Sequence, residues 1–241
     1  MISNDRLWAT KVQCMDDSTE FQLAKRLMKT LVDARIATEK DTTKKQKLNQ
    51  IREIDRGISW VNIFAACFCE HGDLLSQWRG YSKGSYGFAV GFNSDHIYRV
   101  AEKNNFRLAR CIYDEAIQTK IIEEIVDGYL SSTATAAEVE ASLCQVGAFF
   151  KNHHFIDEAE WRLVSPVTDI TDKLVSFRSG RSMITPYFNL PLELENPKPI
   201  EIVRVGPCPH EDLAISNVRM LLMNKDLVPD IEKSQVPYRG W

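Results

Sequence analysis

The chain lacks the features that would assign it directly to a membrane, secreted or nucleotide-binding class. None of its apolar runs approaches the roughly 20 residues that a membrane-spanning helix needs, and its first residues lack the charged and apolar regions of a signal peptide. No Gly-x-Gly-x-x-Gly sequence and no Walker-type phosphate loop occurs, which argues against the usual dinucleotide and nucleotide folds. These absences predict a cytoplasmic protein with no membrane partner.

An excess of charge of one sign is also missing. The sequence has 30 Lys and Arg residues against 33 Asp and Glu residues, so its formal net charge is −3. This balance provides no broad basic field to hold nucleic acid by its phosphates, and nucleic acid remains plausible only as a locally gripped substrate. With 241 residues and 44% hydrophobic content, the chain can bury one substantial core, which favours a single domain over residues 1–241.

The cysteines show no zinc-binding pattern. The six are Cys14, Cys67, Cys69, Cys111, Cys144 and Cys208, and none of their spacings matches a pair of zinc ligands. We expect reduced thiols and no metal site, with Cys67 and Cys69 packing on one face of a strand. A reactive Cys69 is less favoured, because the neighbouring Glu70 would raise the pKa of a thiol.

The apolar periodicity predicts an α+β fold. We expect strands over residues 6–10, 63–68, 106–113, 159–164, 174–177, 183–188 and 200–205, with another beginning at residue 88. A helical excursion is expected near 37–57, a helical segment near 115–152 and a helix over 210–227, each with helical apolar spacing. Because the late strands follow one another without intervening helices, we predict a mixed or largely antiparallel sheet with packed helices rather than a doubly wound parallel sheet.

One candidate site lies between two apolar strands. Glu70, Asp73, Trp78, Arg79 and Tyr81 follow the strand expected at 63–68 and precede the strand that begins at residue 88. Charged and aromatic side chains gathered at strand ends are typical of a pocket lining. The alternative is a strand, a helical turn and a strand whose aromatic side chains only pack.

A second candidate site lies on the strand expected at 159–164. Because strand side chains alternate, Glu158, Glu160 and Arg162 should project from one face while Trp161 anchors the other. The alternative is a solvent-facing strand on which Glu160 and Arg162 balance each other's charge. The preceding pair His153-His154 cannot direct both rings at one metal from a regular element, so we expect it to close a helix.

Several motifs, in order and spacing, resemble those of the bacterial domain-of-unknown-function family 2971, over nearly the whole chain. They are Leu7-Trp8-Ala9-Thr10, Asp16-Asp17-Ser18-Thr19-Glu20-Phe21, Cys67-Phe68-Cys69-Glu70 with Asp73, Trp78, Tyr81 and Gly87, and Glu158-x-Glu160-Trp161-Arg162-Leu163. The family more often has Asn-Asp where this chain has Asp16-Asp17, and Ser in place of Cys69. These substitutions weaken any claim that an amide or a hydroxyl is chemically required at either position.

The Glu-x-Glu strand is similar to that of the ADP-ribosyltransferases, including toxins that modify nucleic acid. This resemblance implies an NAD-using enzyme, either an ADP-ribosyltransferase or an NAD glycohydrolase, acting as an effector or toxin in bacterial defence. Glu160 would stabilise the positive charge that develops on the ribose, and Glu158 would orient or deprotonate a protein or nucleic-acid acceptor. The NAD-binding side chains would be Glu70, Trp78, Arg79, Tyr81, Ser85, Arg162 and Arg178.

The roles within that set differ. Trp78 or Tyr81 would stack on nicotinamide, and Arg79 or Arg162 would bind the pyrophosphate in a bidentate contact. Arg178 would anchor a phosphate or pair with a carboxylate, although surface arginines at a simple turn are the commoner outcome. We predict that the side chains from Glu70 to Tyr81 lie across a cleft from Glu160.

Two other functions fit the same residues. Asp157, Glu158 and Glu160, with Glu70 and Asp73, would form the Mg²⁺ site of a nuclease if the backbone before the strand were irregular. Alternatively, the polar cluster recognises a nucleotide-like ligand without transforming it, as in a sensing or interaction module. Replacement of Glu160 by Gln should abolish activity in an enzyme and leave a binding module intact.

Overall fold

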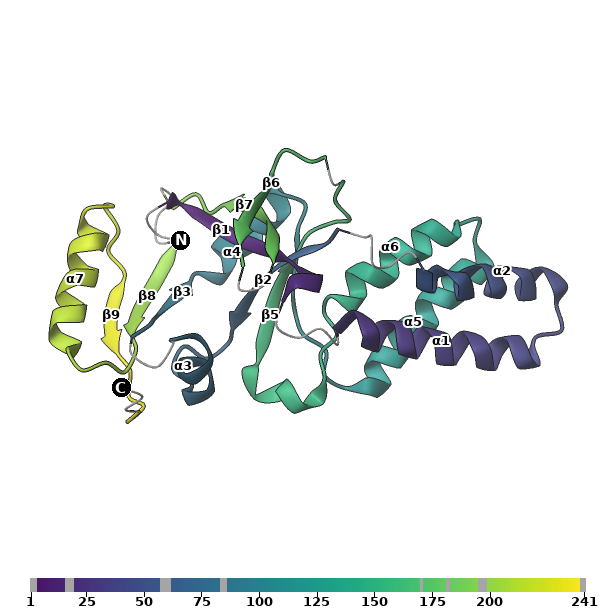
Figure 1. The fold of residues 1–241 in the computed structure, drawn as a ribbon, viewed down its shortest axis with the longest axis horizontal. Helices are drawn as coiled ribbons and strands as arrows, with labels where there is room; N and C mark the ends of the chain where they lie inside the picture. Colours follow the sequence, from purple (N-terminus) through teal and green to yellow (C-terminus); the bar gives the residue numbers. More distant parts are fainter. Residues whose placement is uncertain are drawn as a thin grey trace. The chain divides into compact units, whose positions relative to one another are not determined.

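A computed structural model describes residues 4–15, 20–56, 62–82, 86–169, 171–180, 183–194 and 199–238. The chain forms two compact units (Figure 1). Unit 1 comprises residues 1–7, 68–104 and 190–241, and unit 2 comprises residues 8–67 and 105–189. Both units are assembled from segments that are far apart in the sequence.

Unit 2 contains most of a six-stranded sheet with the strand order β4-β5-β2-β1-β7-β6. The β1–β2, β4–β5 and β6–β7 pairs are antiparallel. The strands are β1 (Arg6–Lys11), β2 (Phe64–Cys69), β4 (Arg107–Arg110), β5 (Glu160–Val164), β6 (Val175–Ser179) and β7 (Ile184–Pro191). In this order β5 and β2, which carry Glu160 and Cys67, are neighbours.

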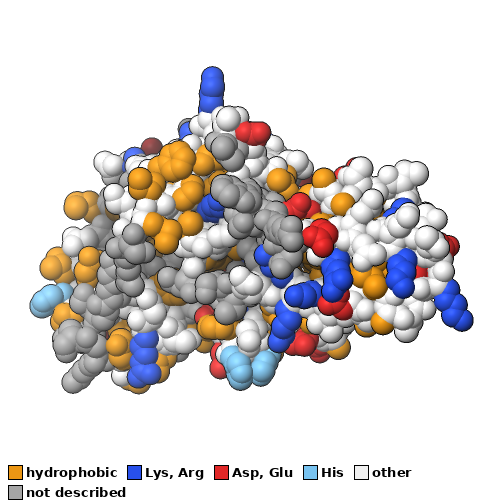
Figure 2. Space-filling model, turned by 45° about the vertical axis from the view of Figure 1, so that its right-hand side comes forward, with side chains coloured by type: hydrophobic (Ala, Val, Ile, Leu, Met, Phe, Trp, Pro, Cys, Tyr) orange, Lys and Arg blue, Asp and Glu red, His pale blue; other side chains and the backbone are white. Residues whose placement is uncertain are grey.

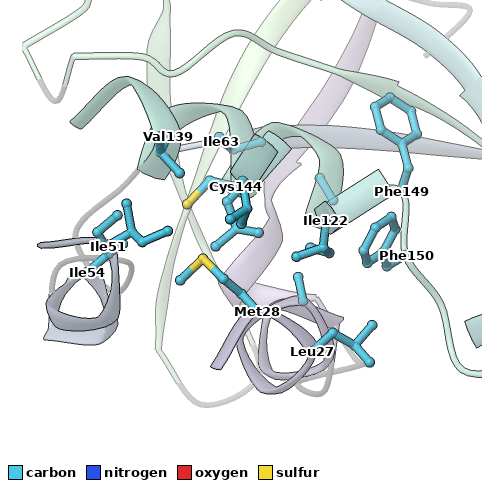
Figure 3. Packing of buried hydrophobic residues seen from close by; sticks show 14 of the residues in the cluster. Leu27, Met28, Ile51, Ile54, Ile63, Ile122, Val139, Cys144, Phe149 and Phe150 are labelled. Atoms are coloured by element: carbon cyan, nitrogen blue, oxygen red, sulfur yellow. The ribbon is translucent and has the colours of Figure 1, made fainter. Parts of the chain in front are cut away.

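Four helices supply most of the core of unit 2. They are α1 (Glu20–Thr38), α2 (Thr42–Arg52), α5 (Glu115–Ser131) and α6 (Ala136–Gly147). Asp41 and Asp114 accept backbone hydrogen bonds at the starts of α2 and α5, and Thr135 forms a capping box at the start of α6. Met28 and Cys144 lie in the middle of the cluster, with Ile51 on one side and Ile122 on the other (Figure 3). Burial raises the pKa of the Cys144 thiol to about 12, so this cysteine packs as an apolar side chain.

Unit 1 contains a three-stranded sheet with the order β3-β8-β9. Its strands are β3 (Phe88–Phe92), β8 (Ile200–Val205) and β9 (Asp230–Lys233), with β3 antiparallel and β9 parallel to β8. The helices of this unit are α3 (Leu75–Tyr81), α4 (Ser94–Lys103) and α7 (Glu211–Met223). The side chain of Asn93 caps α4 by accepting a hydrogen bond from the backbone N–H of His96.

The structure confirms the α+β class and the largely antiparallel sheets, and it corrects the extent of one strand. The strand expected at 106–113 is restricted to Arg107–Arg110, because Ile112 instead bridges to Phe150 in parallel. Residues 16–19 of the motif Asp16-Asp17-Ser18-Thr19-Glu20-Phe21 fall outside the described residues.

The region expected as an excursion near 37–57 contains the end of α1, α2 and a 3-10 turn, Glu53–Arg56. Leu48 and Ile51 of α2 are fully buried in the core.

On the face displayed in Figure 2, basic side chains lie among acidic ones, in keeping with the balanced composition. Over the described part of the chain, no helix combines the length and apolar character needed to cross a bilayer.

Candidate functional site

Glu160 is the first residue of β5, and a sharp bend precedes it. Residues His153–Glu158 form the 3-10 helix η5, which ends at Ala159 in the left-handed conformation with φ 42° and ψ 51°. Positive φ is uncommon for a residue with a side chain, so this bend is a specific feature of the chain. The prediction that Glu158 extends from the same strand as Glu160 is therefore wrong, because Glu158 lies on η5.

Glu160 and Arg162 form a buried ion pair. Arg162 Nε donates to Glu160 Oε1 at 2.8 Å, and Nη2 donates to Oε2 at 3.1 Å. Its Nη1 donates to the carbonyl oxygen of Ala148 at 2.7 Å. Glu160 is 6% exposed and Arg162 is 1% exposed. The solvent-facing interpretation of this strand is therefore wrong, and in this arrangement Arg162 orients Glu160 rather than reaching out to a pyrophosphate.

Lys151 links the two carboxylates. Its buried ammonium donates to Glu158 Oε2 at 2.6 Å and also to Glu160 Oε2, and it lies 5.1 Å from the centroid of the Phe155 ring. Burial opposes the charge of Lys151, but the two carboxylates outweigh it and raise the pKa of this lysine well above its ordinary value. Although Glu158 is not on β5, Lys151 thus brings it into one cluster with Glu160.

Glu160 is held in its ionised form. Burial by itself raises the pKa of its carboxyl group, but hydrogen bonds and charge from Arg162, with hydrogen bonds from Cys67 and Lys151, lower that pKa to about 2. A carboxylate with such a low pKa is a poor general base near neutral pH. It is instead a fixed negative charge in a largely water-excluded position, which suits it to stabilise a developing cation.

Two further residues complete the surroundings of Glu160. The Tyr113 hydroxyl accepts a hydrogen bond from the backbone N–H of Glu160 at 2.9 Å. Cys67 on β2 hydrogen-bonds to the Glu160 side chain, although Cys67 itself is exposed. Sequence reasoning missed Lys151, Tyr113 and Cys67 as site residues. The sequence offered one signal, and it concerned only Lys151: Glu158 and Glu160 were predicted to lie together, and Arg162 alone does not balance two negative charges.

Trp78 and Asp73 have structural roles in unit 1. Trp78 is buried, and its Nε1 donates to Asp73 Oδ1 at 2.7 Å. Asp73 also accepts hydrogen bonds from Ser234 Oγ at 2.5 Å and from the backbone of Gln235 at 2.8 Å. Burial opposes ionisation, but these bonds and the charge of Arg204 lower the pKa of Asp73. The prediction that Trp78 stacks on a ligand is corrected, because its ring is enclosed by the protein.

The other side chains predicted near Trp78 are solvent-facing. Tyr81 is 73% exposed, Glu70 is exposed, and the Arg79 guanidinium lies 5.4 Å from the centroid of the Tyr238 ring. Ser85 falls outside the described residues. Glu70, Arg79 and Tyr81 belong to unit 1 and Glu160 to unit 2, so a cleft shared by these side chains stays a prediction.

Arg178 lies on β6, within unit 2, and is exposed. Its guanidinium lies 5.2 Å from the Trp8 ring centroid and 6.0 Å from that of Tyr187, and Nη2 donates to Thr10 Oγ1 at 3.1 Å. Trp8 is 47% exposed, and its ring centroid is 4.8 Å from that of Tyr187. The expectation of a plain turn is wrong, because Arg178 is a strand residue positioned by two aromatic rings.

The histidine pair does not close an α-helix as expected. His153 and His154 open η5, where both are exposed and their ring centroids are 3.9 Å apart. Within the described ranges, no group of three His, Cys, Asp or Glu side chains is arranged to hold a metal ion. The space between Glu158 and Glu160 is taken by the Lys151 ammonium.

Comparison with known proteins identifies one family. Residues 77–163 match the model of the family described as protein of unknown function (DUF2971), which confirms the suspected family over this part of the chain. The motifs before residue 77 lie outside the matched range. The match extends from α3, with Trp78, to β5, with Glu160 and Arg162. No curated protein and no solved structure matches the chain.

Proposed function

We propose that this chain, whose residues 77–163 belong to DUF2971, is an NAD-consuming enzyme of the ADP-ribosyltransferase or NAD glycohydrolase type. The observation that carries the proposal is Glu160. It is ionised with a pKa of about 2, buried, and fixed by two nitrogens of Arg162. A rigid, partly desolvated anion is the group that a reaction through a cationic transition state requires.

In the proposed reaction, the bond between nicotinamide and C1′ of its ribose breaks. The bonding electron pair leaves with nicotinamide, which neutralises the charge of the pyridinium ring, and positive charge develops on the ribose. Glu160 stabilises this charge without accepting a proton. Loss of one such preorganised electrostatic contact typically lowers turnover about 10²- to 10³-fold.

Glu158 is the carboxylate available to an acceptor. Its side chain is 28% exposed, whereas that of Glu160 is 7% exposed, and Lys151 fixes one of its oxygens. We assign Glu158 to orienting the acceptor, which is water or a group on a macromolecule, and to taking the proton that the acceptor loses when it bonds to C1′. NAD loss or macromolecule modification by such an enzyme fits a toxin or a defence effector.

The Mg²⁺ nuclease is less favoured because of Lys151. A metal ion bridging Glu158 and Glu160 would have to displace a buried ammonium that already contacts both carboxylates. The binding-module alternative does not need Glu160 to act in catalysis, and one observation favours it. Arg162 directs Nε, Nη1 and Nη2 to partners within the protein, which is compatible with a structural role of its pair with Glu160. An ion pair of this kind also occurs as a purely structural feature.

Incubation of the purified protein with NAD, followed by mass analysis, tests the proposal. We expect free nicotinamide, and either ADP-ribose or an ADP-ribosylated macromolecule. Glu158→Gln should lower the rate at least tenfold without unfolding, because Glu158 is partly exposed. Glu115→Gln, on the surface of α5, is the matched control and should leave the rate unchanged. Inertness with NAD together with Mg²⁺-dependent loss of DNA or RNA would select the nuclease, and absence of both reactions would select the binding module.

A further inference from the structure

One side chain from each of five adjacent strands lies on the same face of the six-stranded sheet. In the strand order β5-β2-β1-β7-β6, these are Glu160, Cys67, Trp8, Tyr187 and Arg178. We call them the sheet row. All five belong to unit 2, and the row has a carboxylate at one end and a guanidinium at the other.

Strand pairing and side-chain contacts show that Trp8, Cys67 and Glu160 lie on one face of the sheet. Thr10 of β1 lies opposite Ala65 of β2 in antiparallel register. Two residues further along each strand, Trp8 and Cys67 point to the same side as that pair, since strand side chains alternate. Glu160 joins this side through its hydrogen bond with Cys67.

The other end of the row is fixed by aromatic contacts. The Tyr187 ring contacts that of Trp8 in a tilted arrangement, with the centroids 4.8 Å apart. Ser176 of β6 lies opposite Tyr187, so Arg178 two residues later projects from this face. The long Arg178 side chain reaches back over Trp8 to Thr10 on β1. Its charged group therefore lies about two strand spacings, roughly 10 Å, from β5, which carries Glu160.

Cys67 is the replaceable partner of Glu160. The other donors to this carboxylate, Arg162 and Lys151, are buried and charged, whereas Cys67 is exposed and its S–H group is a weak donor. A ligand hydroxyl arriving from solvent would make a stronger hydrogen bond than the thiol. The side of Glu160 that Cys67 faces is therefore the side from which a ligand reaches the carboxylate.

We propose that the sheet row is the nucleotide-binding surface of this protein. A ribose hydroxyl replaces the Cys67 thiol on Glu160, the ring attached to that ribose stacks on the exposed part of Trp8, and a phosphate pairs with Arg178. Chemical complementarity favours this occupant, because the row offers an acceptor for a ribose hydroxyl, an aromatic face for the ring and a cation for the phosphate. The inference rests on the proposed function and specifies where its substrate binds.

Alkylation of Cys67 by N-ethylmaleimide tests the surface without relying on turnover. The rate is measured by peptide mass analysis, with and without a saturating NAD analogue in which a carbocycle prevents loss of nicotinamide. Binding of the analogue itself is measured by calorimetry. We expect the analogue to slow alkylation of Cys67 at least tenfold and to leave the partly buried Cys14 unaffected.

Substitutions in the row have matched controls on the opposite face of the same sheet. Trp8→Leu and Arg178→Gln should each raise the Kd of the analogue at least fivefold, since base stacking and a charged phosphate contact are lost. Trp161→Leu and Arg110→Gln remove a similar pair, with the Arg110 guanidinium 5.5 Å from the Trp161 ring centroid, and should change the Kd less than twofold. If Trp161→Leu does not fold, Arg110→Gln alone serves as the control.

Two substitutions of Cys67 distinguish a role in ligand binding from a purely structural role. Cys67→Ser introduces a stronger donor that competes with the ligand and should raise the Kd at least threefold, whereas Cys67→Ala should not raise it. The inference would be overturned if the wild-type protein released nicotinamide but Cys67 were alkylated at the same rate with and without bound analogue. The proposed function would then still stand. Protection without nicotinamide release would support the surface and reject the enzyme. Absence of analogue binding would reject both.

Discussion

Arg162 contacts both carboxylate oxygens of Glu160, with Nε 2.8 Å from Oε1 and Nη2 3.1 Å from Oε2. The two residues are separated by only Trp161 on β5, so the alternation of the strand places them on one face. The pair is buried, and its charges are compensated within the protein rather than by water. This relationship helps to keep Glu160 ionised in the candidate site.

Removing one partner of this pair should be more harmful than removing both. Arg162→Met leaves the Glu160 carboxylate buried with less compensation, and we expect a loss of about 3–5 kcal/mol in the free energy of unfolding. The double variant Arg162→Met with Glu160→Leu should lose less, because no unpaired charge remains. Urea unfolding of both variants at neutral pH measures the difference. A double variant less stable than Arg162→Met would show that the pair is strongly stabilising in its own right.

Acid should destabilise the protein through Glu160. The pKa of this residue is lowered from 4.5 to about 2, so its ionised form favours the folded state above the unfolded-state pKa. That contribution, about 3 kcal/mol, is lost as the pH falls from about 4.5 towards 2. Urea unfolding over this range should show the loss in the wild-type protein and a flatter profile in Glu160→Gln. Parallel profiles for the two proteins would locate the acid sensitivity elsewhere.

Asp73 should hold the segment after β9 in place. Asp73→Asn keeps one acceptor oxygen but cannot accept all three hydrogen bonds from Trp78, Ser234 and Gln235. We expect faster hydrogen exchange at the Gln235 amide and a loss of about 1–3 kcal/mol in unit 1. Asp212→Asn, at the exposed start of α7, is the control. Unchanged exchange at Gln235 in Asp73→Asn would refute this role.

Gly206 should not tolerate a side chain, because it lies against the Trp78 ring. A Cβ atom there would be 2.7 Å from Trp78 Cζ3 and 3.1 Å from the carbonyl oxygen of Gly87. We expect Gly206→Ala to lose about 1–3 kcal/mol of stability and to change the tryptophan near-ultraviolet circular dichroism. Gly80→Ala, on α3 with no atom within 4 Å of the added methyl group, should be neutral or slightly stabilising. Equal stability of the two variants would contradict the packing described for Trp78.

The sequence predicts Glu160 and Arg162 well because their proximity follows from the alternation of one strand. Lys151 and Cys67 could not be placed in the same way, since their contacts depend on the turn of η5 and on the neighbouring position of β2 and β5. The backbone preference of alanine did not predict the bend at Ala159, because alanine rarely adopts positive φ. Trp78 illustrates the opposite error, since a cluster of polar and aromatic residues indicated a pocket where the tryptophan is part of a packed core.

Nicotinamide release from NAD, compared among the wild type, Glu160→Asp and Glu160→Gln, tests the central claim most directly. The claim is that the fixed negative charge of Glu160 stabilises a cationic transition state. We predict measurable release by the wild type and a decrease of about 10²-fold or more in Glu160→Gln, provided that circular dichroism shows a folded protein. Glu160→Asp keeps the charge but withdraws it by one methylene group, and its rate should be intermediate. Release by folded Glu160→Gln at the wild-type rate would contradict the account.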